Sequence, residues 1–141
     1  MILYIDNNYM ETLMRFANDF TNARYIIRAY SKGTVRINDT DYHHSVILSQ
    51  DQLISPWPIA SLNQLQATDF QNLVALSPEL VIIGVGDTFT FVKPQLLQPL
   101  YDKQIGVEIM TTDAACRTYN LLVGEGRKIV ACLIINALSN D

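Results

Sequence analysis

Polar side chains that could bind or react with a ligand concentrate in the segment from Thr111 to Asn120, which reads TTDAACRTYN. Thr111 or Thr112 can accept hydrogen bonds from the free N–H groups of a helix start, and Asp113 suits the positive end of the helix dipole. Arg117 and Asn120 lie three residues apart, so both fall on one face of such a helix. The pattern is that of an ordinary helix start, and it also fits one wall of a small-molecule site.

Two glycines, Gly84 and Gly86, follow an apolar run at the spacing that begins a dinucleotide-binding fingerprint. Phe89 stands where that fingerprint needs a third glycine, and the next helix is predicted to begin only at Pro94. The N-terminus of that helix therefore cannot meet a pyrophosphate in this turn. The glycines instead indicate a loop at the end of a strand, and we expect no cofactor.

The carboxyl ends of neighbouring strands usually form the ligand crevice of an open α/β sheet. The strands that end at Gly84 and Met110 should meet at one such edge, so a ligand-binding crevice there is the alternative to a purely structural role for these residues. Its candidate residues are Gly84, Gly86, Asp87, Thr111, Thr112, Arg117, Asn120 and Arg127.

The two arginines of this set each have two interpretations. Arg117 brings a positive charge beside a helix start, which suits an anion or an acidic residue of a partner. We favour internal pairing, with Asp87, Asp113 or Glu125, because an arginine beside several carboxylates is commonly satisfied within its own chain. Arg127 and Glu125 lie in a turn, where they are either solvated or paired with Asp113 and Arg117 to fix the loop.

Neither the cysteines nor the histidines form a catalytic or metal-binding set. Cys116 lies on the apolar stripe of its helix and Cys132 within an apolar strand, so both are expected to be buried and inert. His43 and His44 are adjacent, so on a strand they point to opposite faces, and nothing nearby completes a set of metal ligands. We therefore predict no catalytic residue and no metal site.

The composition excludes several classes of protein. The 141 residues include 10 Lys and Arg against 14 Asp and Glu, a net charge of −4, whereas nucleic-acid binding needs a clustered basic surface. The longest apolar run, Ile129 to Ile135, is far shorter than the about 20 residues of a bilayer-spanning helix. The first 20 residues hold three acidic side chains against the single Arg15, unlike a secretory or transit signal. We expect a cytoplasmic protein without membrane insertion.

Apolar and β-branched runs in the first half predict an antiparallel meander of three strands. The predicted strands are Tyr25–Tyr30, Thr34–Asn38 and Ser45–Ser49, with turns at Ser31–Gly33 and Asn38–Asp41. Residues 1–22 are assigned to an N-terminal extension in which Tyr9, Leu13, Phe16 and Phe20 would share one face of a short helix. Residues 23–141 are assigned to a single α/β domain.

The second half alternates strands with helices. Three helices are predicted. The first runs from a cap at Thr68-Asp69 to Pro78, and the third from a cap at Thr111–Asp113 to about Val123. The second runs from Pro94 to Gly106, and its inward face would consist of Leu96, Leu97, Leu100 and Tyr101. The strands Glu79–Gly84, Val107–Met110 and Lys128–Ile135 are largely apolar, and the first and last lack alternation, as expected of strands buried on both faces. The long βαβαβ crossovers predict parallel pairing. With the meander, they predict an α/β fold with a mixed sheet covered by helices.

Several of these segments together resemble one known family. Four segments occur in the order and at the spacing expected of the small uncharacterised Mth-type domain family. They are Pro78 to Gly86, Gly106 to Thr112, Ala114 to Leu122 and Glu125 to Arg127. Its eukaryotic branch includes assembly factor three of mitochondrial NADH:ubiquinone oxidoreductase (respiratory complex I). The similarity covers about Ala23 to Ala137 and implies a compact three-layer α/β/α domain. It carries over no catalytic residue, and this chain has Val85 where members often have a threonine.

The resemblance implies a non-enzymatic accessory or assembly protein of the bacterial cytoplasm that acts through contacts with an unidentified protein partner. The alternative is a small-molecule-binding protein or weak enzyme that uses the crevice near Gly86, Thr112, Arg117 and Asn120. A broad exposed apolar patch would favour the first hypothesis, and a ligand in the crevice would favour the second. The sequence leaves the oligomeric state open.

Overall fold

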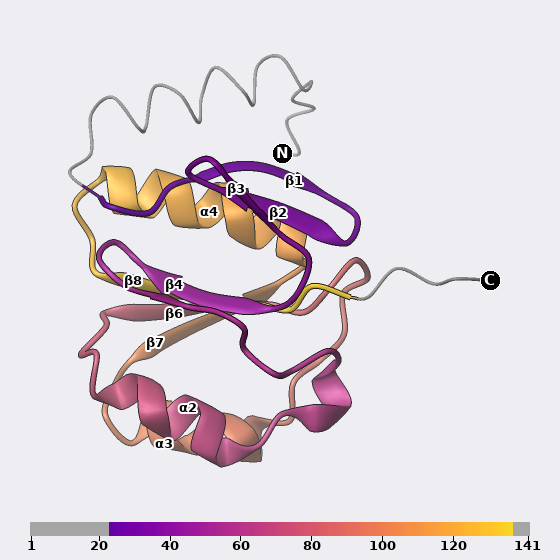
Figure 1. The fold of residues 1–141 in the computed structure, drawn as a ribbon. Coiled ribbons are helices and arrows are strands. Elements are labelled where there is room, and N and C mark those ends of the chain that lie inside the picture. The colour runs from indigo at the N-terminus through magenta and orange to yellow at the C-terminus, as the bar shows by residue number, and fades with distance from the viewer. Residues whose placement is uncertain (1–22, 137–141) are drawn as a thin grey trace, which may run out of the picture.

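Two layers containing helices cover a central sheet of five strands (Figure 1). The computed structural model describes residues 23–136, so the helix predicted within residues 1–22 lies outside the described residues. Helices α2 and α3 cover one face of the sheet, while α4 and a small second sheet cover the other. The three-layer α/β/α fold with a mixed sheet is therefore confirmed.

The five-stranded sheet has the order β5-β4-β8-β6-β7. Strand β6 pairs in parallel with β7 and β8, whereas β4 pairs antiparallel with β5 and β8. The bounds are β4 Val46–Ser49, β5 Leu53–Ile54, β6 Leu80–Gly84, β7 Gly106–Met110 and β8 Ile129–Leu133. The parallel βαβαβ half is as predicted.

The antiparallel meander is present, but its third strand differs from the prediction. The small sheet consists of β1 Ile27–Ser31, β2 Thr34–Ile37 and β3 Thr40–Tyr42, in that order. The turn after β2 occupies only Asn38 and Asp39, because Asn38 adopts a left-handed φ of 53°. The predicted third strand, Ser45–Ser49, belongs instead to the large sheet as β4, where all of its residues are buried.

Among the described residues, three helices form in the predicted places, but the helix predicted from Pro94 to Gly106 is reduced to a 3₁₀ turn and a short α-helix, and the one predicted to reach Pro78 ends at Val74. The helices are α2 Ala67–Val74, α3 Gln98–Tyr101 after a 3₁₀ turn η2 at Pro94–Leu97, and α4 Thr112–Gly124, and a further 3₁₀ turn η1 spans Leu62–Gln64. Helix α2 begins before the predicted cap, because Asp69 accepts a hydrogen bond from the Gln66 N–H at 2.8 Å and closes a capping box there. Tyr101 was expected to face inward but is half-exposed, since α3 ends at that residue.

Two apolar cores lie on the two faces of the large sheet. Alternate residues of β6 supply both: Val81 and Ile83 pack under α2 and α3, while Ile82 packs under α4. Phe70, Leu97 and Leu100 complete the first core, and Ala115, Cys116 and Tyr119 complete the second together with Ile27 and Val35 of the small sheet. The uninterrupted apolar sequence of β6 follows from this burial on both faces.

Buried polar groups of α4 attach the small sheet to the domain. Asn120 is 3% exposed, and its side-chain Oδ1 accepts a hydrogen bond from the Ile27 N–H at 3.0 Å. Its Nδ2 donates to the Ile27 carbonyl at 2.6 Å, so one amide satisfies both backbone groups of a β1 residue. The Tyr119 hydroxyl adds a hydrogen bond to the Tyr25 carbonyl at 2.8 Å.

We expect Asn120→Ala to lower the free energy of unfolding by about 1–3 kcal/mol, because it leaves the Ile27 N–H and carbonyl buried without partners. Chemical denaturation followed by circular dichroism measures this. Asn72→Ala is the matched control, since Asn72 is an exposed asparagine of α2 and its removal should change stability by less than about 0.5 kcal/mol. Equal losses in the two variants would show that the Asn120 bonds contribute nothing.

Candidate functional site

The end of β6 at Gly84 and the loop that follows it, residues 85–93, form the centre of the predicted site. Gly84 lies directly under the start of α4, where a Cβ atom would come within 2.9 Å of the Thr112 Cα. Gly86 has a φ of 109°, a conformation that favours glycine, and a Cβ there would collide with the Asn136 side chain. The two glycines are therefore explained by close packing and backbone conformation.

Thr112 ties together three elements at this edge of the sheet. Its buried hydroxyl accepts a hydrogen bond from the Gly86 N–H at 2.8 Å and donates one to the Ile134 carbonyl at 2.7 Å. The Thr112 N–H also donates to the Gly86 carbonyl at 2.9 Å. Thr111, as predicted, caps α4: its hydroxyl accepts from the Ala114 N–H at 3.4 Å. Both threonines are thus occupied by the chain itself.

Two residues that the sequence analysis missed hold the next position of the loop. Asn136 accepts a hydrogen bond from the Asp87 N–H at 3.1 Å, and Tyr30 of β1 donates its hydroxyl to the Asp87 carboxylate at 2.6 Å. Burial of the Tyr30 ring and the hydrogen bond to Asp87 raise the pKa of the Tyr30 hydroxyl above its ordinary value. The position of Asn136 just after an apolar strand was a usable signal, because β6 and β8 are parallel and end at the same edge.

Arg117 pairs within the chain, with one of the three carboxylates considered. Its guanidinium lies 2.7 Å from the Asp113 carboxylate, one helical turn earlier. The two side chains are 40% and 58% exposed, so solvent screens the pair and it stabilises the fold only weakly. A positive group thus remains accessible at the start of α4.

Asn120 and Arg127 lie away from the crevice predicted to contain them. Asn120 is buried against β1, and both ends of its amide are used there. Arg127 precedes β8, next to Lys128, whose N–H donates to the Glu79 carboxylate at the start of β6. That is the amino end of the parallel strands, opposite to the loop at Gly86. Because Asp113 lies in the first turn of α4 and Glu125 follows its last turn, the position of this turn favours the solvated alternative for Glu125 and Arg127 over pairing with Asp113 and Arg117.

The cysteines and histidines occupy structural surroundings. Cys116 and Cys132 are fully buried, and burial raises the pKa of both thiols far above the ordinary value, which disfavours the reactive thiolate. The Nδ1 of His43 lies 3.0 Å from the Thr34 hydroxyl. Within residues 23–136, no group of three His, Cys, Asp or Glu side chains is arranged to hold a metal ion.

The outer part of the loop displays aromatic side chains to solvent. Phe91 is 86% exposed and Phe89 is 46% exposed, and their rings meet edge to face with centroids 5.2 Å apart. A hollow of about 290 Å³ adjoins Phe91, and it is lined by Leu62, Asn63, Leu65, Thr90, Phe91, Val92, Lys93 and Leu96. Apolar and lysine side chains thus meet at one place on the surface, which we call the Phe89–Phe91 surface.

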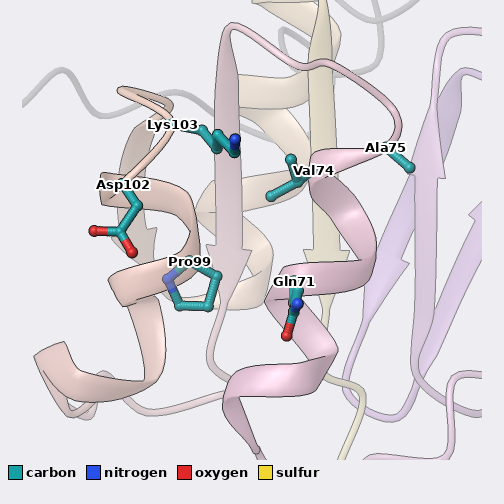
Figure 2. Close-up of a pocket in the computed structure, with 6 residues that line it drawn as sticks. All are labelled: Gln71, Val74, Ala75, Pro99, Asp102 and Lys103. Carbon is teal, nitrogen blue, oxygen red and sulfur yellow. The ribbon is translucent and has the colours of Figure 1, made fainter.

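A second hollow, of about 540 Å³, lies between α2 and α3 (Figure 2). Its lining consists of Gln71, Val74, Ala75, Pro99, Asp102 and Lys103. Asp102 already accepts a hydrogen bond from the Gln98 side chain at 2.7 Å. The hollow is open to solvent and lies under the sheet face opposite to α4, so it is separate from the predicted crevice.

Comparison with known proteins places these features in a family. The family model described as "Protein of unknown function (DUF498/DUF598)" matches residues 27–134. The "13 kDa major membrane protein" of Francisella tularensis is 29% identical over 87% of this chain and 100% of that protein. The "NADH dehydrogenase [ubiquinone] 1 alpha subcomplex assembly factor 3" of mouse is 30% identical over 92% of this chain and 70% of that protein.

The fold is shared with solved structures. A Bordetella pertussis protein described as a Mth938-like domain superposes with a TM-score of 0.73 at 24% identity, covering 99% of this chain and 96% of the other. None of the helices within the described residues is long and apolar enough to cross a membrane. The similarity to assembly factor 3 that the sequence motifs predicted is confirmed, and because the family model covers most of the chain, this chain belongs to the DUF498/DUF598 family.

Proposed function

We propose that the protein is a non-enzymatic accessory or assembly protein that acts through contacts with a protein partner. The kinship with the assembly factor supports the accessory role. The observation that carries the contact proposal is the Phe89–Phe91 surface. The Phe91 ring is 86% exposed, so its burial against a partner would remove apolar surface from water and thereby favour binding.

The attachment of the loop supports the same proposal. The Thr112 hydroxyl and the Asn136 side chain hold the loop at Gly86 and Asp87, a few residues before the exposed rings. Anchored aromatic residues lose little conformational entropy on binding, and they are enriched among the residues that dominate protein interfaces. The apolar surface is small, so we propose that it is one anchor of a larger contact.

The alternative function, binding or conversion of a small molecule in the crevice, has fewer groups available than the sequence predicted. Thr112 and Asn120 are consumed by internal hydrogen bonds, whereas Asp87 and Arg117 keep exposed charged groups. An anionic ligand would have to compete with Asp113 for the Arg117 guanidinium. The cytoplasmic location also stays a proposal, because one relative carries the name of a membrane protein.

We expect Phe91→Ser to weaken binding of the natural partner by about 2 kcal/mol, roughly a thirtyfold increase in Kd, as for a central aromatic contact. The melting temperature should stay unchanged, since the exposed Phe91 ring contributes little to the core. Affinity capture of tagged wild type and variant from the native cells, followed by quantitative mass spectrometry, identifies the partner. Leu121→Ser is the control, since Leu121 is 53% exposed on α4, away from this loop. Retention of the same partner by Phe91→Ser would rule out this surface.

We expect Arg117→Ala to change the free energy of unfolding by less than about 0.5 kcal/mol, because the pair with Asp113 is solvent-exposed. The same variant tests the alternative function. Isothermal titration with inorganic phosphate as the anionic probe should give equally weak heats for wild type and Arg117→Ala under the assembly proposal. Saturable phosphate binding that disappears in Arg117→Ala would favour the small-molecule alternative.

A further inference from the structure

Strand β7 forms one edge of the large sheet and pairs only with β6 (Figure 1). The Gly106 N–H donates to the Glu79 carbonyl at 3.1 Å, and the Met110 carbonyl accepts from the Val85 N–H at 2.9 Å. In a parallel strand alternate residues direct both backbone groups to the same side. Gly106, Glu108 and Met110 therefore bond to β6, while the N–H and carbonyl groups of Val107 and Ile109 point away from the sheet.

Apart from one charged side chain, this edge lacks the features that normally protect an edge strand. The opposite edge, β5, has only 2 residues, whereas β7 has 5 in unbroken register with β6. Strand β7 contains no proline, lysine or bulge, and Glu108 is its one charged residue. Four backbone hydrogen-bonding groups are thus presented in a row, with half-buried Val107 and Ile109 side chains on one face and exposed Glu108 on the other.

A second copy of the chain fits this edge poorly. Only an antiparallel register centred on Glu108 uses all four outward groups, by pairing Val107 of each copy with Ile109 of the other. That register sets the two Glu108 side chains opposite each other, with Cβ atoms about 5 Å apart, which is destabilising for like charges. A register centred on Ile109 would need Thr111, whose carbonyl is already bonded to the Ala115 N–H. One centred on Val107 would need Ile105, whose N–H donates to the Leu100 carbonyl.

We propose that β7 is a docking edge for an extended segment of a partner protein, which adds as a further antiparallel strand with a lysine or arginine opposite Glu108. Backbone hydrogen bonds to Val107 and Ile109 supply the attachment, and the basic residue supplies the choice of segment. The net charge of −4 favours a basic segment over an acidic one. The edge uses none of the residues of the Phe89–Phe91 surface, so either proposal can fail without the other.

The test uses the full chain and blocked heptapeptides of the sequence Thr-Thr-Val-Xaa-Val-Thr-Thr, with lysine or glutamate at the centre. Amide hydrogen exchange is followed by NMR. The lysine peptide should slow exchange at Val107 and Ile109 roughly fivefold when it occupies about 80% of the chain. The Glu108 and Met110 amides, which already donate to β6, are internal references. A lysine peptide with both valines N-methylated should give no slowing.

A charge reversal makes the test specific. The wild type should prefer the lysine peptide over the glutamate peptide by roughly two- to fivefold in Kd, and Glu108→Lys should reverse that preference. Glu125→Lys makes the same charge change at an exposed position after α4 and should leave the preference as in wild type. Three results would each overturn the proposal. They are unchanged exchange at both Val107 and Ile109, an unchanged peptide preference in Glu108→Lys, and binding of the N-methylated peptide. Slowing that depends on protein concentration alone would overturn it in favour of a second copy.

Discussion

The hydroxyl of Thr112 accepts a hydrogen bond from the loop after β6 and donates one to the chain after β8, while its own backbone begins α4. Because this hydroxyl is buried, it provides the hydrogen-bonding partner that the Gly86 N–H and the Ile134 carbonyl need inside the protein. About two turns further along the same helix, Asn120 fixes β1 in the same way. The position of one helix thus determines both the loop that carries the exposed aromatics and the sheet that covers the second core.

Those parts of the fold with strong local signals were predictable from the sequence. Strands β6 and β8 are runs of five buried residues, and α4 has a threonine cap, an acidic first turn and an apolar stripe. The destination of Ser45–Ser49 was not predictable from local pattern, because a short apolar strand reads the same in either sheet. Its partner, β8, lies far along the sequence. Which sheet Ser45–Ser49 joins is determined by that long-range pairing and by the burial of its side chains on both faces.

The candidate site was predictable in its backbone but not in its side-chain contacts. The two glycines marked the loop correctly, whereas Asn120 could not be assigned, since a polar residue beside an apolar stripe is either exposed or bonded to a buried backbone that sequence cannot locate. Tyr30 illustrates the same limit, because its contact with Asp87 joins two different layers. Arg127 was a different error, since it precedes β8 while the crevice follows β6. In parallel strands these two positions lie at opposite ends of the strands.

The order of strands in the large sheet has a consequence for how the chain reaches this structure. Strand β8 lies at the centre, between β4 and β6, yet it is the last of the described strands to be synthesised. Without residues 129–133, the strand pairs β5-β4 and β6-β7 have no strand to join them, and the inner edges of β4 and β6 lack their hydrogen-bonding partner. Such pairing over long sequence separations slows folding and exposes aggregation-prone surface in the nascent chain. The large sheet therefore closes only after β8 has been synthesised and inserts between its two neighbours.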